Sequence, residues 1–159
     1  MKKNIFILAI LPLLLSSCFA YKAIPVQIDP ISKTIDVSLL KDDAWVKANN
    51  WMVKTFVSSE SVIEFTDKEA GIINGKYNFF SLGTGTSLAV TTKINASVFI
   101  QSKDYVVRIT VDPQDYSTIE GGALYDPYKY PKEEAIKSIN ALIEDFEDYM
   151  LNNKSLEEF

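Results

Sequence analysis

Ile94-Asn95-Ala96-Ser97-Val98-Phe99-Ile100-Gln101 carries the strongest structural signal in this chain. Apolar and polar residues alternate along it, and a period of two is typical of a β-strand with one buried face. After the polar turn 102–104 the alternation resumes, with Tyr105, Val107, Ile109 and Val111 on the apolar side. So short a turn joins neighbouring antiparallel strands, so these segments predict the centre of an antiparallel sheet.

Three other segments show the strand period more briefly. They are Lys33–Leu39 with Ile35, Val37 and Leu39 on one side, Ser61–Thr66 with Ile63 and Phe65 on one face, and Ile72–Phe80 with Ile73, Tyr77 and Phe79 inward. A polar turn over 67–71 joins the last two. Gly75 predicts a bulge or a close backbone approach, because glycine within a strand commonly marks one or the other.

Two segments have the period of amphipathic helices. The first is expected from Asp42 or Asp43, as N-cap, to about Val57. Its apolar arc holds Ala44, Trp45, Ala48, Trp51, Met52, Thr55 and Phe56, with Lys47, Asn50 and Lys54 opposite. The second begins with Pro131 at N1 and carries an apolar arc of about 140° from Ala135 to Met150. Its acidic outer face is Glu144, Asp145, Glu147 and Asp148.

The strands also share a polar set that faces away from their apolar residues. Its members are Glu64, Thr66, Asn74, Lys76, Asn78, Asn95, Ser97, Gln101, Arg108 and Thr110. Both helices must then cover the other, apolar face of the sheet. The sequence therefore predicts a two-layer α+β domain over residues 31–155, with the order β-α-β-β-β-β-α and no second domain.

The N-terminal segment has the three parts of a secretory signal peptide. Lys2 and Lys3 give a positive end, residues 5–15 form an apolar run, and small residues precede the chain's single cysteine. Leu15-Ser16-Ser17-Cys18 resembles a bacterial lipobox, whose cysteine is acylated after residues 1–17 are removed. The resemblance implies a covalent lipid on Cys18 and a tether over 18–30. Phe19 to Lys22 contain no acid, and in the lipoproteins that this segment resembles such a sequence implies an outer membrane anchor facing the periplasm.

Composition narrows the classes of function. Removing residues 1–17 takes away two lysines and no acid, so the net charge of −5 becomes −7 in the remaining 142 residues. An acidic protein is a poor match for nucleic acid phosphates. The chain has no histidine, and its one cysteine is assigned to lipid, so the commonest general base, metal ligand and thiol nucleophile are missing. We therefore expect no enzyme, no cofactor beyond the lipid and no metal.

Residues 112–131 contain four tyrosines, Tyr116, Tyr125, Tyr128 and Tyr130, among proline and glycine turn signals. An irregular segment this long is uncommon in a compact domain and is often functional. Two interpretations stay open: the rings pack over the sheet edge or the final helix, or they face a ligand.

The element order and three short motifs together resemble a bacterial lipoprotein family of unknown function with a TBP-like (TATA-binding-protein-like) fold. The first motif runs from Asp43-Ala44-Trp45 to Trp51 on the first helix. The second is the turn and strand 67–76, and the third is the turn 103–105 that leads to Arg108. The family pattern often has glycine where this chain has Tyr105. The resemblance implies the fold over about 25–152 and no particular activity.

These observations predict a lipid-anchored envelope protein that serves as a binding or assembly module without chemistry of its own. The expected partner is an envelope protein or a glycan, held by Tyr125, Tyr128, Tyr130, Glu64, Lys76 and Arg108. The alternative is an envelope hydrolase that uses a serine with a lysine, or paired carboxylates. The oligomeric state stays open.

Overall fold

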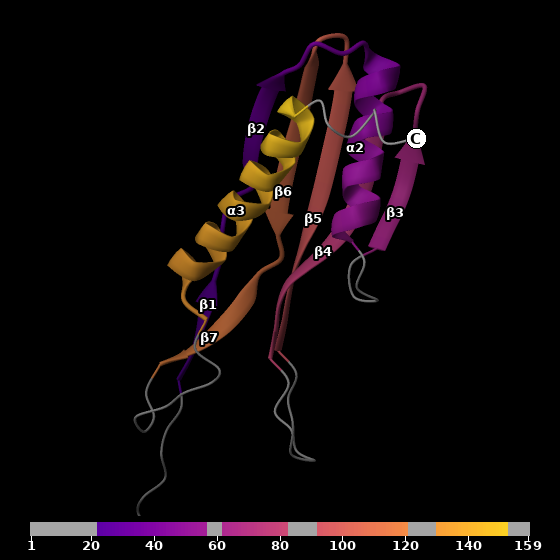
Figure 1. Ribbon diagram of the computed structural model, residues 1–159. Helices are drawn as coiled ribbons and strands as arrows, with labels where there is room; N and C mark the ends of the chain where they lie inside the picture. The colour runs from indigo at the N-terminus through magenta and orange to yellow at the C-terminus, as the bar shows by residue number, and fades with distance from the viewer. Residues whose placement is uncertain (1–21, 57–61, 83–91, 121–129, 153–159) are drawn as a thin grey trace, which may run out of the picture.

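The computed structural model describes residues 22–56, 62–82, 92–120 and 130–152. Its elements, in chain order, are β1 (Lys22–Val26), β2 (Ile31–Asp36), α2 (Lys41–Thr55), β3 (Val62–Asp67), β4 (Ile72–Leu82), β5 (Thr92–Lys103), β6 (Val106–Pro113), β7 (Tyr116–Glu120) and α3 (Lys132–Leu151). Figure 1 views the sheet from the side on which both helices lie. The predicted α+β class and two-layer arrangement are confirmed.

The main sheet has the strand order β2-β6-β5-β4-β3, with every neighbouring pair antiparallel. β4, β5 and β6 follow one another as a meander, which the short turns predicted. β2 joins the far side of β6. The chain then passes over one end of the sheet into α2, which runs along the strands and leads to β3 at the opposite edge (Figure 1).

β1 and β7 form a separate antiparallel ladder, with Pro25 opposite Ser117. Neither strand was predicted: β1 lies in the expected tether 18–30, and β7 lies in the segment expected to be irregular. Pro25 breaks the strand signal in the first, since proline cannot donate to a ladder. The described structure therefore includes residues 22–30, which precede the predicted start of the domain at residue 31.

The core lies between the sheet and the two helices. Ile94, Ala96, Val98 and Ile100 on β5 are almost fully buried, as the alternation predicted. Trp51 of α2 is 1% exposed, and its ring meets that of Phe146 on α3 in an edge-on contact with centroids 4.8 Å apart. Trp51 therefore packs in the core, as its place on the apolar arc of the helix predicted. Lys33, at the sheet edge, pairs with Glu147 of α3.

Gly75 stands on the buried face of β4, where the helix layer comes very close. A Cβ there would lie 2.6 Å from Met52 Cε and 2.9 Å from the backbone oxygen of Val62. The predicted close approach is therefore confirmed.

The face assigned to the C-terminal half of β3 is corrected by the structure. Ile63 pairs with Gly75, but Phe65 pairs with Asn74, so the register shifts by one residue at Glu64. A bulge of this kind reverses the faces of all later residues in the strand. Phe65 therefore points away from the helices, and Thr66, expected on the polar face, lies opposite buried Ile73.

Two predictions about the first helix are wrong. Neither aspartate is the N-cap: Leu40 occupies that position, and Asp42 and Asp43 lie in the first turn. Lys47, expected to face solvent, is 1% exposed. Its Nζ donates hydrogen bonds to the carbonyl oxygens of Met150 (3.0 Å) and Asn152 (2.8 Å) at the end of α3. The last carbonyls of a helix need donors, and this buried lysine supplies them.

Within the described residues, no helix is both long enough and apolar enough to cross a bilayer. The described residues also contain no group of side chains suited to hold a metal ion.

Candidate functional site

The open face of the sheet, meaning the face opposite the helices, is the most informative surface in the described residues. Strand register sets its side chains in rows across the strands. One row is Phe65, Asn74, Phe99, Thr110 and Ser32, and the next is Asp67, Ile72, Gln101, Arg108 and Thr34. The two described helices both lie on the opposite side of the sheet (Figure 1). The predicted polar face is thus exposed, and it also carries aromatic rings that the sequence did not assign to it.

Three apolar side chains on the strands of this face are exposed: Val62 (45%), Phe65 (54%) and Phe99 (38%). We call them the apolar row residues. Phe65 and Phe99 belong to one row, separated by Asn74 on β4, so their strands are about 10 Å apart. Alternation alone could have placed Phe99 outward, whereas Phe65 depended on a bulge that alternation does not reveal.

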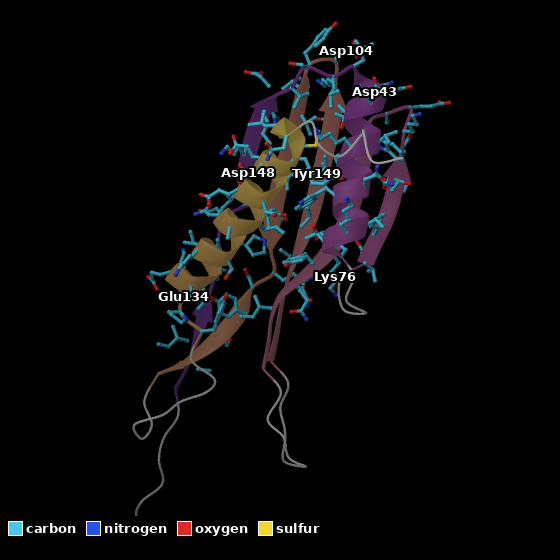
Figure 2. All side chains as sticks on the ribbon, in the orientation of Figure 1. Asp43, Lys76, Asp104, Glu134, Asp148 and Tyr149 are labelled. Atoms are coloured by element: carbon cyan, nitrogen blue, oxygen red, sulfur yellow. The ribbon has the colours of Figure 1, made fainter. Side chains whose placement is uncertain are left out.

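The six side chains predicted to bind a partner occupy different places. Lys76 and Arg108 both lie on the open face, and Glu64 is the exposed extra residue in the bulge of β3 beside it. Lys76 lies toward the end of β4 that is remote from the turn at Asp104 (Figure 2). The structure therefore brings three of the predicted residues to one surface.

Tyr125 and Tyr128 lie outside the described residues. Tyr130 is half-buried, and its hydroxyl lies 3.0 Å from Ser138 Oγ and 3.4 Å from the carbonyl of Glu134, to which it donates. Its ring centroid is 6.2 Å from that of Tyr116. For Tyr130, these contacts favour the packing interpretation.

A wide hollow of about 770 Å³ lies between β1 and the first turn of α3. It is lined by residues 24–27 and 131–133.

Tyr116 has a hydroxyl that is buried and lacks a hydrogen-bond partner in the described residues. Burial, followed by the nearby Tyr130 and Glu133, raises the pKa of this phenol from 10.0 to about 12. A raised pKa favours the protonated form in the folded protein, so stability is fully present below pH 10 and is lost as pH rises toward 12.

Tyr116→Phe is expected to raise the free energy of unfolding by about 1 kcal/mol at neutral pH, because it removes an unpaired buried hydroxyl. The advantage of the variant should then grow between pH 10 and pH 12, where the wild type alone loses stability through this group. Urea denaturation at several pH values measures both effects. A variant less stable than the wild type at all pH values would show that the hydroxyl has a partner.

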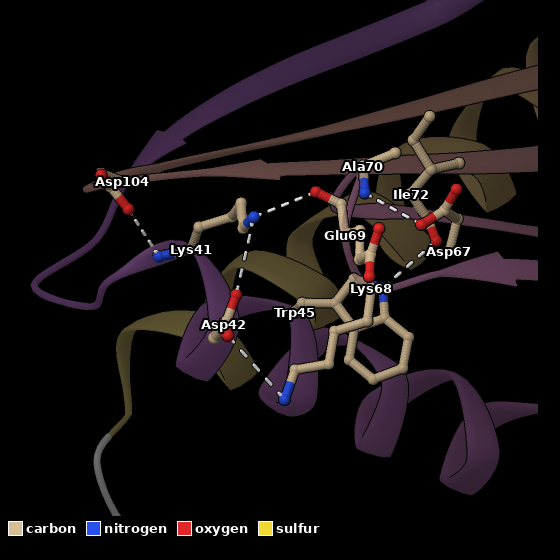
Figure 3. Close-up of polar contacts among 9 residues, drawn as sticks. All are labelled: Lys41, Asp42, Trp45, Asp67, Lys68, Glu69, Ala70, Ile72 and Asp104. Atoms are coloured by element: carbon tan, nitrogen blue, oxygen red, sulfur yellow. Dashed lines mark hydrogen bonds and ion pairs between the residues drawn. The ribbon is translucent and has the colours of Figure 1, made fainter.

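The three motifs that carried the family resemblance meet at one end of the molecule (Figure 3). Asp104 Oδ1 accepts a hydrogen bond from the backbone N–H of Lys41 (2.9 Å), so the β5–β6 turn caps α2. Trp45 Nε1 donates to the carbonyl of Ile72 (3.2 Å), and Lys41 Nζ donates to that of Glu69 (3.0 Å). These contacts join the helix to both turns, which gives the motifs a structural role.

Tyr105, at the position where glycine is often found in the family pattern, has φ of 65°. This left-handed conformation is the one that glycine adopts without cost. Its N–H donates to the carbonyl of Leu39, and its carbonyl accepts from the N–H of Val37, both at 2.9 Å. The backbone therefore keeps the geometry of the turn although the side chain differs.

Ser102 and Asp67, beside the β5–β6 and β3–β4 turns, are poorly placed for chemistry. Ser102 is 1% exposed, and its hydroxyl has no partner in the described residues. Asp67 accepts a hydrogen bond from the N–H of Ala70 (2.9 Å), which stabilises the β3–β4 turn. A serine sealed in this way cannot reach a substrate without local opening of the structure.

No family model matches the chain, and no curated protein matches it. Among solved structures, a TBP-like protein from Parabacteroides distasonis matches 76% of this chain and 91% of its own, with 17% identity and a TM-score of 0.52. The fold is therefore TBP-like, as predicted. A DUF4468 family protein from Bacteroides ovatus is also similar, over 79% of this chain and 84% of its own, with 17% identity and a TM-score of 0.44.

Proposed function

We propose that this protein is a lipid-anchored protein of the bacterial cell envelope that binds a partner through the open face of its sheet and carries out no reaction itself. In this proposal Cys18 bears the lipid, the anchor lies in the outer membrane, and the domain faces the periplasm. The protein would then belong to the TBP-like lipoproteins of unknown function that its motifs resemble.

The exposure of Phe65 is the observation that supports the binding role most strongly. An ordinary register would have buried this ring against α2, but the bulge at Glu64 turns it outward, where it is 54% exposed. Bulges commonly aim a side chain for a purpose, and grouped exposed apolar residues commonly mark interaction sites. With Val62 and Phe99 beside it, Phe65 gives an otherwise polar face an apolar centre.

Replacing the two rings tests this role. Phe65→Ser with Phe99→Ser should reduce capture of the envelope partner by at least about tenfold in pull-downs from detergent-solubilised membranes, because exposed aromatic anchors dominate interface energies. Val53→Ser is the matched control, since Val53 is 56% exposed on α2 in the helix layer. Capture that is unchanged in the double variant, or equally reduced in the control, would overturn the proposed face.

The anchor is tested separately. Mass spectrometry of the mature N-terminus should find Cys18 as residue one, carrying acyl chains, and Cys18→Ser should release the domain from the membrane. Each buried methylene contributes about 0.8 kcal/mol of membrane affinity, so loss of the acyl chains should abolish membrane retention. An unmodified thiol would overturn the lipid anchor while leaving the binding face untouched.

A further inference from the structure

A small hollow lies on the open face where β2, β5 and β6 meet near the β5–β6 turn. Its volume is about 110 Å³, and it is lined by Thr34, Gln101, Lys103, Val106 and Arg108. Arg108 stands between Gln101 and Thr34 in the strand register, so the guanidinium has an amide on one side and a hydroxyl on the other. Val106 contributes an apolar part of the lining.

The two cations of this hollow have no acidic partner among the described residues. The ion pairs of the described residues involve other lysines, namely Lys33, Lys41 and Lys68. Asp36 lies opposite Val106 on the same face, but it forms no ion pair with Lys103 or Arg108. Two neighbouring cations without an ion pair therefore stand on one face of a chain whose net charge is −5.

Arg108 is also held in a definite orientation. Its Nε donates to Thr34 Oγ1 at 3.2 Å, which leaves the two terminal nitrogens of the guanidinium to meet a ligand. Planar guanidinium groups bind carboxylates through paired hydrogen bonds, and such charge-assisted bonds are about twice as strong as neutral ones. The hollow therefore has a directional donor, a second point charge in Lys103 and room for one small anionic group.

Phe99 lies on β5, the strand next to that of Arg108, and Phe65 lies two strands further on, on β3. Adjacent strands are about 4.8 Å apart, so the strand of Phe99 is about 5 Å from that of Arg108, and the strand of Phe65 is about 14 Å away. An extended peptide advances about 3.4 Å per residue, and alternate side chains share one face. A peptide crossing the strands would thus place position 1 at Arg108, position 3 near Phe99 and position 5 near Phe65.

We infer that the open face binds an extended protein segment whose carboxylate occupies the hollow at Arg108 and Lys103, and whose apolar side chains two and four residues further on lie over Phe99 and Phe65. This inference rests on the proposed function and names the chemistry of its partner. Asp36, Asp67 and Asp112 lie on the same face and would repel an anionic bilayer or a doubly charged phosphate. These acids repel a single carboxylate less than they repel a doubly charged phosphate or an anionic bilayer, so the carboxylate is favoured among the three.

Peptide binding to the full-length protein in neutral detergent micelles tests this chemistry. The probe is acetyl-Asp-Ser-Leu-Ser-Leu-amide, and the matched peptide has Asn in place of Asp. The Asp peptide should bind about tenfold more tightly, and Arg108→Gln should remove that preference. Lys137→Gln is the control variant, because it changes the net charge equally on an exposed part of α3. Added salt should weaken the Asp peptide more than the Asn peptide.

Three results would overturn the inference. They are equal binding of the Asp and Asn peptides, an Asp preference that survives Arg108→Gln, and binding of inorganic phosphate or phosphatidylglycerol vesicles through Arg108 without binding of the peptide. If an envelope partner is captured through Phe65 and Phe99 but ignores Arg108→Gln, the proposed function stands and this inference fails. Loss of capture in Arg108→Gln, with capture retained in Lys137→Gln, supports it.

Discussion

Gly71→Ala is expected to lower the free energy of unfolding by about 3 kcal/mol, through backbone strain and a steric clash. Gly71 ends the β3–β4 turn with φ of 72°, a conformation that alanine adopts only at a cost. A Cβ at this position would lie 2.3 Å from the carbonyl oxygen of Ser102. That oxygen belongs to the backbone of a central strand, so it cannot move aside as a flexible side chain would.

The clash cannot be relieved by shifting the turn away from β5. The carbonyl of Gly71 accepts a hydrogen bond from the N–H of Ser102 at 2.7 Å, so any shift breaks this bond. Urea denaturation measures the loss, and Ala70→Ser at the exposed neighbouring position is the control, with an expected change within about 0.5 kcal/mol. A loss below about 1 kcal/mol for Gly71→Ala would contradict this close contact.

Lys47→Met is expected to lower the free energy of unfolding by about 2–3 kcal/mol. Methionine fills a similar volume, but it cannot donate to the carbonyls of Met150 and Asn152, which Lys47 Nζ now satisfies. The variant also removes a positive charge from the negative end of the α3 dipole. Lys54→Met is the matched control on α2, because Lys54 is exposed. The Nζ of Lys54 contacts only the face of the Tyr149 ring among the contacts described, 5.3 Å from its centroid.

The effect of Lys47→Met on stability is also expected to depend on pH. Burial lowers the pKa of the Lys47 ammonium below its ordinary value of 10.5. Between the folded and unfolded pKa values the unfolded chain binds more protons, so the stability of the wild type rises with pH in that window. The stability gap between wild type and Lys47→Met should therefore widen as pH approaches 10.5. A gap that narrows would show that the folded protein favours the charged form.

The sequence predicted the sheet well because alternation reports directly which face is buried. The segments around Val98 and Ile109 gave the correct strands and the correct neighbours, and they gave the correct faces except at Tyr105, which lies in the turn and is 60% exposed. Gly75 was also identified, since a glycine within a strand has few physical explanations. In these places, local pattern and tertiary packing require the same residues.

The failures have definite physical causes. Alternation assumes an unbroken register, so a one-residue bulge at Glu64 reversed Phe65 and Thr66 without any local signal. Lys47 was placed opposite the apolar arc of its helix, and its partners are carbonyls more than 100 residues away in the chain. β1 and β7 stabilise each other across a similar distance, which no local period reveals.

The candidate site was predicted in part. Lys76 and Arg108 were placed on the polar face, which is correct, because both follow the strand period. The hollow at Arg108 depends on β2 lying beside β6, and that neighbourhood is a property of the topology. Phe65 was assigned to the core. The sequence therefore identified the charged part of the surface and missed its apolar part.

Photo-crosslinking in intact cells tests the open face most directly. A photoreactive phenylalanine analogue at position 65 should crosslink to one defined envelope protein, and the same analogue at position 53, exposed on the helix layer, should not. Addition of Arg108→Gln should weaken the crosslink at position 65. A crosslink at position 53 with none at position 65 would contradict the account and move the binding surface to the helices.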